Sequence, residues 1–168
     1  QSVIGMSASE LSIQNSTIFS KIDLSEGSKL TLENVHIEKF GNNTIHAKDS
    51  EVIAKNSTIT GGDLEKDFPP VWLRNVIWES ENCKIELPTG TGVCLDNNVQ
   101  FNSDSDRMTS INSFNSMIRA HQATFTEFLC VYEESFASLT GETTFLNENA
   151  QTISFGVFDD GVLMAEHM

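Results

Sequence analysis

The stretch LTLENVHI, residues 30–37, shows the pattern from which the fold can be predicted. Apolar Leu30 and Leu32 alternate with polar residues, Asn34 follows, and apolar Ile37 stands three residues later. A period of two is typical of a β-strand that buries one face, and Asn favours a turn. Six further copies of the frame are residues 11–18 (LSIQNSTI), 52–59 (VIAKNSTI), 71–78 (VWLRNVIW), 93–101 (VCLDNNVQF), 118–125 (IRAHQATF) and 137–145 (ASLTGETTF).

The copies follow one another at a nearly constant distance. Their turn positions, separated by 19, 22, 19, 22, 25 and 19 residues, are Asn15, Asn34, Asn56, Asn75, Asn97, Gln122 and Gly141. A fixed period of about 20 residues is the signature of a solenoid. Each coil of such a fold has room for three short strands and buries its inner face against the coils above and below it. We therefore expect an all-β parallel solenoid with 19–25 residues per coil.

The asparagines at the turn position are expected to form a stack. The predicted stack consists of Asn15, Asn34, Asn56, Asn75 and Asn97. An inward Asn can bond the backbone groups that a bend leaves unpaired, and it tolerates the left-handed backbone of such turns. We therefore predict that Asn34 and Asn56 are buried and bonded to the backbone.

With this pattern, residues 11–145 resemble the right-handed, single-stranded parallel β-helix of the pectate-lyase-like superfamily, in which stacked asparagines line one turn. The resemblance implies a segment similar to an adhesin, an autotransporter passenger or a phage fibre. Two sister folds do not fit. Left-handed β-helices have 18 residues per coil, which the observed spacings break, and pentapeptide solenoids need an apolar residue at every fifth position.

The chain is expected to form one domain over residues 1–168. Residues 1–10 form an end coil or cap, residues 11–145 seven repeat coils, and residues 146–168 a terminal partial coil. Because the sequence begins with Gln1 rather than Met, we expect a piece of a longer chain. Open ends of a solenoid leave strand edges unpaired, which would allow oligomers to form through them.

Charge and composition limit the partners. The net charge is -14, from 24 acidic against 10 basic residues, and nucleic acid or an anionic membrane surface would require basic patches. No apolar run approaches the roughly 18 residues of a membrane helix, so no membrane insertion is expected. The resemblance implies a secreted or cell-surface protein of a bacterium or phage. Cys83, Cys94 and Cys130 are expected to be free thiols, because the predicted coils keep Cys83 and Cys130 too far apart for a disulfide.

The widest step, from Asn97 to Gln122, predicts a polar loop over residues 101–108 that projects from the coil. Its candidate ligand-binding residues are Asn102, Asp104, Asp106 and Arg107. Alternating oxygen ligands resemble part of a calcium loop, so Asp104 and Asp106 are candidate ligands of a weak calcium site, although the Gly and distal Glu of an EF-hand are missing. No other cofactor is expected. In pectate-lyase-like enzymes Asp residues bind calcium and an Arg acts as the base, but no catalytic residue is identified here.

Two functions follow from this pattern. The first is a non-enzymatic surface, adhesion or structural module that presents loops to a glycan or a host surface receptor. The alternative is a polysaccharide lyase or a glycoside hydrolase, which would need two carboxylates on one face. Glu79 and Glu81 would share a side of a strand, whereas Glu133 and Glu134 would not. A groove that holds three or more acids favours the enzyme, and an evenly polar flank favours the binding module.

Overall fold

The computed structural model describes residues 2–63, 69–86, 92–146 and 155–166. Every regular element in this part of the chain is a β-strand, and no described helix is long and apolar enough to cross a membrane. In chain order the strands are β1 (Val3–Ser7), β2 (Glu10–Gln14), β3 (Thr17–Ile18), β4 (Lys21–Ser25), β5 (Lys29–Glu33), β6 (His36–Phe40), β7 (Ile45–Lys55), β8 (Thr58–Gly62), β9 (Val71–Glu81), β10 (Lys84–Glu86), β11 (Val93–Asp96), β12 (Gln100–Asp104), β13 (Arg107–Phe114), β14 (Met117–His121), β15 (Thr124–Tyr132), β16 (Phe136–Thr140), β17 (Thr144–Phe145), β18 (Phe155–Val157) and β19 (Val162–Ala165).

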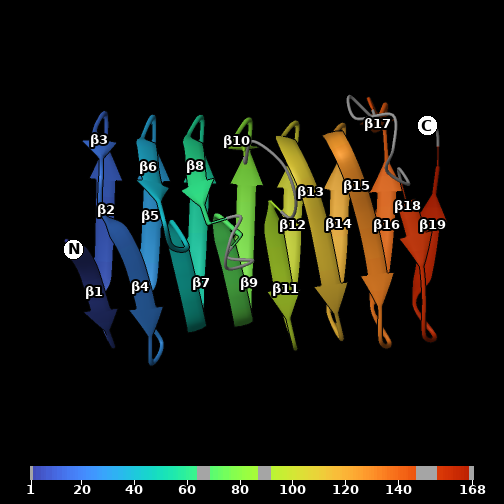
Figure 1. Ribbon diagram of the computed structural model, residues 1–168, viewed down its shortest axis with the longest axis horizontal. Coiled ribbons are helices and arrows are strands. Elements are labelled where there is room, and N and C mark those ends of the chain that lie inside the picture. The colour runs from blue at the N-terminus through green and yellow to red at the C-terminus, as the bar shows by residue number, and fades with distance from the viewer. Residues whose placement is uncertain (1, 64–68, 87–91, 147–154, 167–168) are drawn as a thin grey trace.

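The strands wind into a parallel β-solenoid of about seven turns, stacked from the N-terminal to the C-terminal end (Figure 1). This confirms the predicted fold class. We call each turn of the solenoid a rung. Rung 1 is β1 to β3, rung 2 is β4 to β6, rung 3 is β7 and β8, and rung 4 is β9 and β10. Rung 5 is β11, β12 and the start of β13. Rung 6 is the rest of β13, β14 and the start of β15, and rung 7 is the rest of β15, β16 and β17. In rung 8 the described strands are β18 and β19.

Each rung contributes to three walls. The first wall contains β1, β4, β11, β18 and the matching parts of β7, β9, β13 and β15. The second wall contains β2, β5, β12, β14, β16, β19 and the C-terminal halves of β7 and β9. The third wall contains β3, β6, β8, β10, β17 and the starts of β13 and β15. We call the bends after the first, second and third walls the first, second and third corners.

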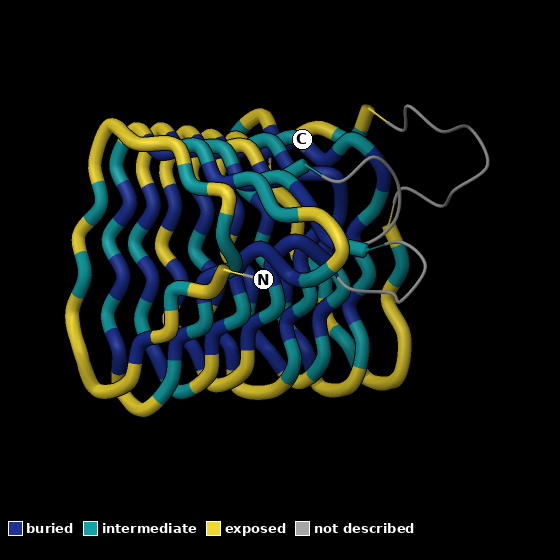
Figure 2. Tube along the Cα trace, turned by 60° about the vertical axis from the view of Figure 1, so that its left-hand side comes forward, coloured by how far each residue is buried: buried dark blue, intermediate teal, exposed yellow. Residues whose placement is uncertain are grey.

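The core is built from columns of inward side chains. In Figure 2 the buried positions recur along the trace from one rung to the next. On the second wall, Leu30 pairs with Val52, Val52 with Trp78, and Trp78 with Phe101, all fully buried. The rings of Trp78 and Phe101 stack with centroids 5.7 Å apart. Burying each such side chain stabilises the fold by about 1.5–3 kcal/mol, so the columns hold one rung to the next.

The predicted register is wrong at two of the seven copies of the repeat. Val71 pairs with Ile45 and Val93 on the first wall, whereas the partner of Val52 on the second wall is Trp78. Residues 71–78 and 93–101 therefore bend at the first corner, and the other copies bend at the second. Both corners are entered by the same apolar alternation and use the same left-handed turn residues, so the pattern alone does not distinguish them.

The asparagines form exposed ladders instead of one buried stack. At the second corner Asn34 Nδ2 donates to Asn15 Oδ1 (3.3 Å) and Asn82 Nδ2 to Asn56 Oδ1 (2.8 Å). At the first corner the ladder pairs, with donor Nδ2 and acceptor Oδ1, are Asn98 with Asn75 (2.5 Å) and Asn115 with Asn97 (2.7 Å).

The predicted burial of Asn34 and Asn56 is therefore wrong. Both adopt positive φ (53° and 48°), both are exposed, and the residue after each turns inward instead. Their backbone N–H groups are satisfied by the carbonyls of Lys55 (3.1 Å) and Glu81 (3.0 Å) in the next rung.

Small hydroxyl side chains, rather than asparagines, bond the backbone groups on the inner side of the corners. Buried Ser57 donates to the carbonyl of Lys55 (2.8 Å) and accepts from the N–H of Val35 (3.1 Å). At the first corner, Ser116 donates to the carbonyl of Phe114 (2.8 Å) and accepts from the N–H of Val99 (3.2 Å). A hydroxyl is both donor and acceptor, so one short side chain satisfies two backbone groups inside the bend.

The projecting loop predicted over residues 101–108 is not formed. This stretch contains the end of β12, an ordinary second corner at Ser105 and Asp106, and the start of β13. The step from Asn97 to Gln122 is longer than the others because Asn97 lies at the first corner of one rung and Gln122 at the second corner of the next. The longer connections instead lie at the third corner, between β6 and β7, β8 and β9, β10 and β11, and β17 and β18.

The three cysteines are free, as predicted. Cys83 and Cys130 lie in different parts of the coil, because Cys83 is buried at the second corner and Cys130 is on the first wall. Cys94 and Cys130 do share a first-wall column, but Asn112 stands between them. Two rung steps are about 10 Å, which is beyond disulfide reach.

A candidate ligand-binding groove on the second wall

A groove with a volume of about 450 Å³ runs along the outer surface of the second wall, across rungs 3 to 7. Its floor contains the short residues Ala54, Ser80, Ser103 and Ala120, whose side chains are buried. Because strand side chains alternate between the two faces, no large side chain covers the backbone at these positions. The floor is therefore a strip of sheet between two rows of outward side chains.

These two rows line the groove in register. The middle column is Ile53, Glu79, Asn102, Arg119 and Ser138. The corner column, which borders the second corner, is Lys55, Glu81, Asp104, His121 and Thr140. Register neighbours in adjacent strands lie about 4.8 Å apart. The groove therefore presents pairs of side chains at a regular axial step.

The charges in the groove are only partly paired with one another. Lys55 Nζ lies 2.9 Å from Glu81 Oε2, and this hydrogen bond raises the pKa of Lys55. Glu79 and Asp104 are exposed and form no ion pair within the described part of the chain. Asp104 Oδ1 accepts a hydrogen bond from the neighbouring Ser105 hydroxyl (3.0 Å), so its Oδ2 and the carboxylate of Glu79 remain open to a ligand.

The C-terminal end of the groove, at Arg119 and His121, forms polar contacts. Arg119 Nη1 reaches Asn102 Oδ1 at 3.5 Å, and His121 Nδ1 lies 3.0 Å from Thr140 Oγ1. Both Arg119 and His121 are exposed, so their remaining donors and acceptors face solvent.

A buried carboxylate forms hydrogen bonds with the floor of the groove from inside the coil. Asp106 is 1% exposed; its Oδ1 accepts from the N–H of Cys83 (2.7 Å), and its Oδ2 accepts from the hydroxyls of Ser103 (2.7 Å) and Ser80. Burial raises the pKa of Asp106 above its ordinary value, although these hydrogen bonds oppose the shift. Ser80 also accepts from Trp78 Nε1 at 2.8 Å. The groove floor and the core are thus tied to one buried group.

The four residues predicted as a ligand site do not converge. Asn102 and Asp104 line the groove, but Arg107 begins β13 on the third wall and Asp106 points inward. The calcium pairing is not formed, because Asp104 is exposed at the surface while the oxygens of Asp106 are bonded inside the coil. Among the described residues, no three His, Cys, Asp or Glu side chains are grouped as they would be around a metal ion.

Several groove residues were not identified from the sequence. They are Ile53, Lys55, Arg119, His121, Ser138 and Thr140. Each of them stands two or four residues after the first residue of its second-wall strand. They could have been identified from the sequence only if the start of every second-wall strand had been known. Glu79 and Glu81 do share the outer side, as predicted, and both line the groove. Glu133 and Glu134 both lie exposed at the first corner, away from it.

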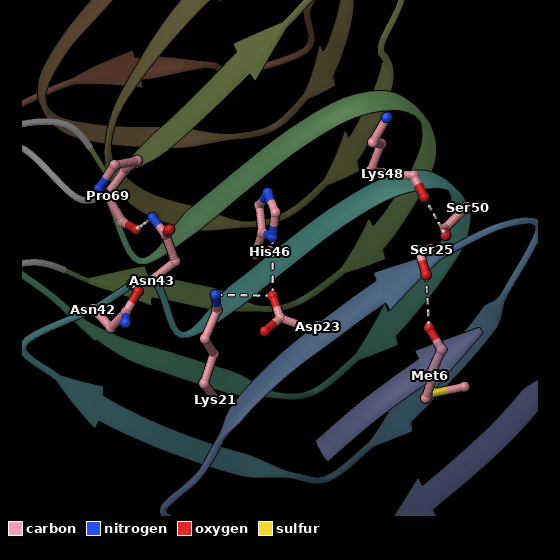
Figure 3. A network of polar contacts seen from close by, with 10 residues as sticks. All are labelled: Met6, Lys21, Asp23, Ser25, Asn42, Asn43, His46, Lys48, Ser50 and Pro69. Carbon is pink, nitrogen blue, oxygen red and sulfur yellow. Dashed lines mark hydrogen bonds and ion pairs between the residues drawn. The ribbon is translucent and has the colours of Figure 1, made fainter. Parts of the chain in front are cut away.

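A second hollow, of about 640 Å³, lies on the first wall near the N-terminal end. There Asp23 Oδ1 accepts from Lys21 Nζ (2.8 Å) and lies 2.9 Å from His46 Nδ1 (Figure 3). The His46 ring also packs on Trp72, with ring centroids 4.5 Å apart. Because these groups already bond one another, we regard the second-wall groove as the stronger candidate site.

Comparisons of the chain with protein-family models, with curated proteins and with solved structures gave no match.

Proposed function

We propose that the protein is a non-enzymatic β-solenoid module that binds an extended glycan in the second-wall groove. The observation that carries the proposal is the groove itself, because it combines a floor of short side chains with two in-register rows of outward side chains, all polar except Ile53. Five rungs span four steps of about 4.8 Å, roughly 19 Å, so several sugar rings would fit along it. Amide and hydroxyl groups such as those of Asn102, Ser138 and Thr140 are suited to bonding sugar hydroxyls.

The rigid wall supports this function. The floor belongs to strands paired on both sides, so the groove is in place before a ligand arrives and loses little conformational entropy on binding. We further propose the setting expected from the sequence, outside the cell or on a cell surface, with a glycan or a glycan-bearing receptor as partner. Fractionation of the producing cells with an antibody to the chain tests the location.

A glycan array followed by calorimetry tests the binding proposal. The purified chain should bind one class of glycan, and Asn102→Ala and Thr140→Ala should each weaken binding about fivefold, the loss of roughly one hydrogen bond. Thr58→Ala on the third wall is the matched control and should leave affinity unchanged. Absence of any array ligand, or equal affinity in the groove variants and the control, would refute the proposal.

The second candidate, a glycoside hydrolase or lyase, is favoured by the three acids Glu79, Glu81 and Asp104 in one groove. Glu81 and Asp104 are register neighbours, about 4.8 Å apart in the backbone, and retaining hydrolases hold two carboxyl groups about 5–5.5 Å apart. Against it, the carboxylate of Glu81 is engaged by Lys55. Release of reducing ends or unsaturated products from the array ligand, abolished in Asp104→Asn, would establish this activity in place of simple binding.

A further inference from the structure

We propose that the groove selects a glycan whose sugars carry protonated amino groups. This inference rests on the proposed function, because it names the ligand class of the same groove. The observation behind it is that the acidic and basic side chains are unevenly distributed along the length of the groove.

The acids are gathered in the middle of the groove. Rung 4 contributes Glu79 and Glu81, and rung 5 contributes Asn102 and Asp104, so the acidic section covers two adjacent rungs. Lys55 of rung 3 neutralises Glu81 from the N-terminal side. The remaining acceptors of this section are the carboxylates of Glu79 and Asp104 and the amide oxygen of Asn102, all at the outer surface.

These acceptors suit an ammonium group. An ammonium has three N–H donors and no acceptor, and it would find two carboxylates and one carbonyl oxygen on neighbouring strands. A neutral N-acetyl group would leave both carboxylates without a positively charged partner. The difference between the two forms of one sugar therefore measures how much the acidic section contributes.

Arg119 marks the C-terminal limit of this section. It follows Asn102 in the middle column and contacts its amide oxygen at 3.5 Å. Its positive charge opposes an ammonium seated over rungs 4 and 5, and it also competes for the Asn102 oxygen. Removing this charge should therefore strengthen the binding of an amino-bearing chain, whereas removing the charge of Glu79 should weaken it.

The groove fits a glycan better than a basic peptide. The backbone groups of the floor strands are engaged in pairing with the rungs on both sides, so an added peptide strand finds no free edge there. Among the outward residues of the groove, Ile53 is the apolar one, so apolar peptide side chains would find few contacts. Hydroxyl and amide side chains instead match the many hydroxyls of a sugar chain.

Calorimetry with three probes of similar length tests the inference at low salt and at about pH 6, where sugar amines are protonated and the carboxylates stay ionised. The probes are the β-1,4-linked glucosamine tetramer, the same tetramer N-acetylated, and tetralysine. We expect the glucosamine tetramer to bind about tenfold more tightly than either of the others, and its binding to weaken as sodium chloride is added.

Two variants with opposite expected signs sharpen the test. Glu79→Gln should weaken binding of the glucosamine tetramer about three- to tenfold, and Arg119→Gln should strengthen it by a similar factor. Glu38→Gln and Lys84→Gln make the same charge changes on the third wall and should have no comparable effect. If only the net charge of the protein mattered, the groove variants and the controls would change the affinity for the glucosamine tetramer equally.

The outcomes separate the two proposals. Equal binding of the acetylated tetramer, tighter binding of tetralysine, or a change of the wrong sign in either groove variant would overturn the amino-sugar inference. So would binding of neither tetramer when another array glycan still depends on Asn102. In that last case the proposed glycan-binding function stands, because only the ligand class is wrong.

Discussion

The hydroxyl of Ser103 donates a hydrogen bond of 2.7 Å to Oδ2 of Asp106, three residues later and on the buried side of the second corner. The same carboxylate also accepts from Ser80 and from the N–H of Cys83, so a single side chain joins β9 and β12 to the corners beside them. The groove floor thus depends on a group that no ligand can reach.

Replacing Asp106 with Ala should destabilise the fold by about 3 kcal/mol or more. The change leaves the N–H of Cys83 and two hydroxyls without their acceptor, and each unsatisfied buried group costs roughly 1–3 kcal/mol. Urea unfolding of the variant measures the loss. Asp104→Ala, two residues away but exposed, is the control and should stay within about 0.5 kcal/mol of wild type. Equal midpoints for the two variants would contradict the role given to Asp106.

The two tryptophans should differ sharply when truncated. Trp78 is fully buried against Phe101, so Trp78→Ala should cost about 3–5 kcal/mol through lost burial and a cavity. Trp72 lies on the outer side of the first wall, half-buried beside His46, and Trp72→Ala should cost clearly less. Thermal unfolding of both variants provides the comparison, and a larger loss for Trp72 would invert the assigned wall faces.

The fold was predictable because its strongest signal is periodic. Alternating residues such as Leu30 and Leu32, repeated at about 20-residue steps, allow hardly any arrangement other than stacked coils of strands. The register was less predictable, because Asn56 and Asn75 look alike in sequence but occupy different corners. Each coil turns several times, and a period alone does not say at which corner a given turn residue lies.

The site was harder to predict for the same reason. A groove on a sheet is composed of residues that lie side by side only through register, such as Glu79, Asn102 and Arg119. One misplaced corner assigns the residues around it to the wrong wall, as happened for residues 71–78 and 93–101. Short sequence clusters, in contrast, attract attention without being sites: Asp104 and Asp106 alternate within one stretch, yet a corner between them turns one outward and the other inward.

Substitutions at Asn34 should distinguish an exposed ladder from a buried stack. Its φ is 53° and its side chain is exposed, so Asn34→Gly should change stability by only a few tenths of a kcal/mol. Asn34→Val places a β-branched side chain in left-handed backbone and should cost about 1–3 kcal/mol. Chemical denaturation of both variants decides. A large loss in the Gly variant would show that the amide group itself is needed.

The thiols should be present but poorly reactive. Burial raises the pKa of Cys83 and of Cys94 to about 11, so at pH 7–8 little thiolate is available in the folded protein. Titration with a thiol reagent should proceed slowly in the native state and reach three thiols after unfolding without reductant. A count of one would reveal a disulfide and contradict the separation of the three residues.

The pH dependence of stability should carry the signature of Asp106. Its pKa in the folded protein is raised above the ordinary 3.8, with burial as the largest cause. Between those two pKa values the folded state binds more protons than the unfolded state, so the contribution of Asp106 to the free energy of unfolding falls as pH rises. This contribution is fully present below 3.8 and is lost as pH increases through the folded pKa.

The many exposed acids titrate in the same region, so the test compares wild type with Asp106→Asn. The Asn variant keeps the side chain's shape but cannot ionise, which removes this one term from the curve. Urea unfolding at steps from pH 3.5 to 7 should show wild type losing stability relative to the variant as pH rises. Parallel curves, or a wild type that gains relative to Asp106→Asn over that range, would mean that the hydrogen bonds from Cys83 and Ser103 outweigh the effect of burial on this carboxylate.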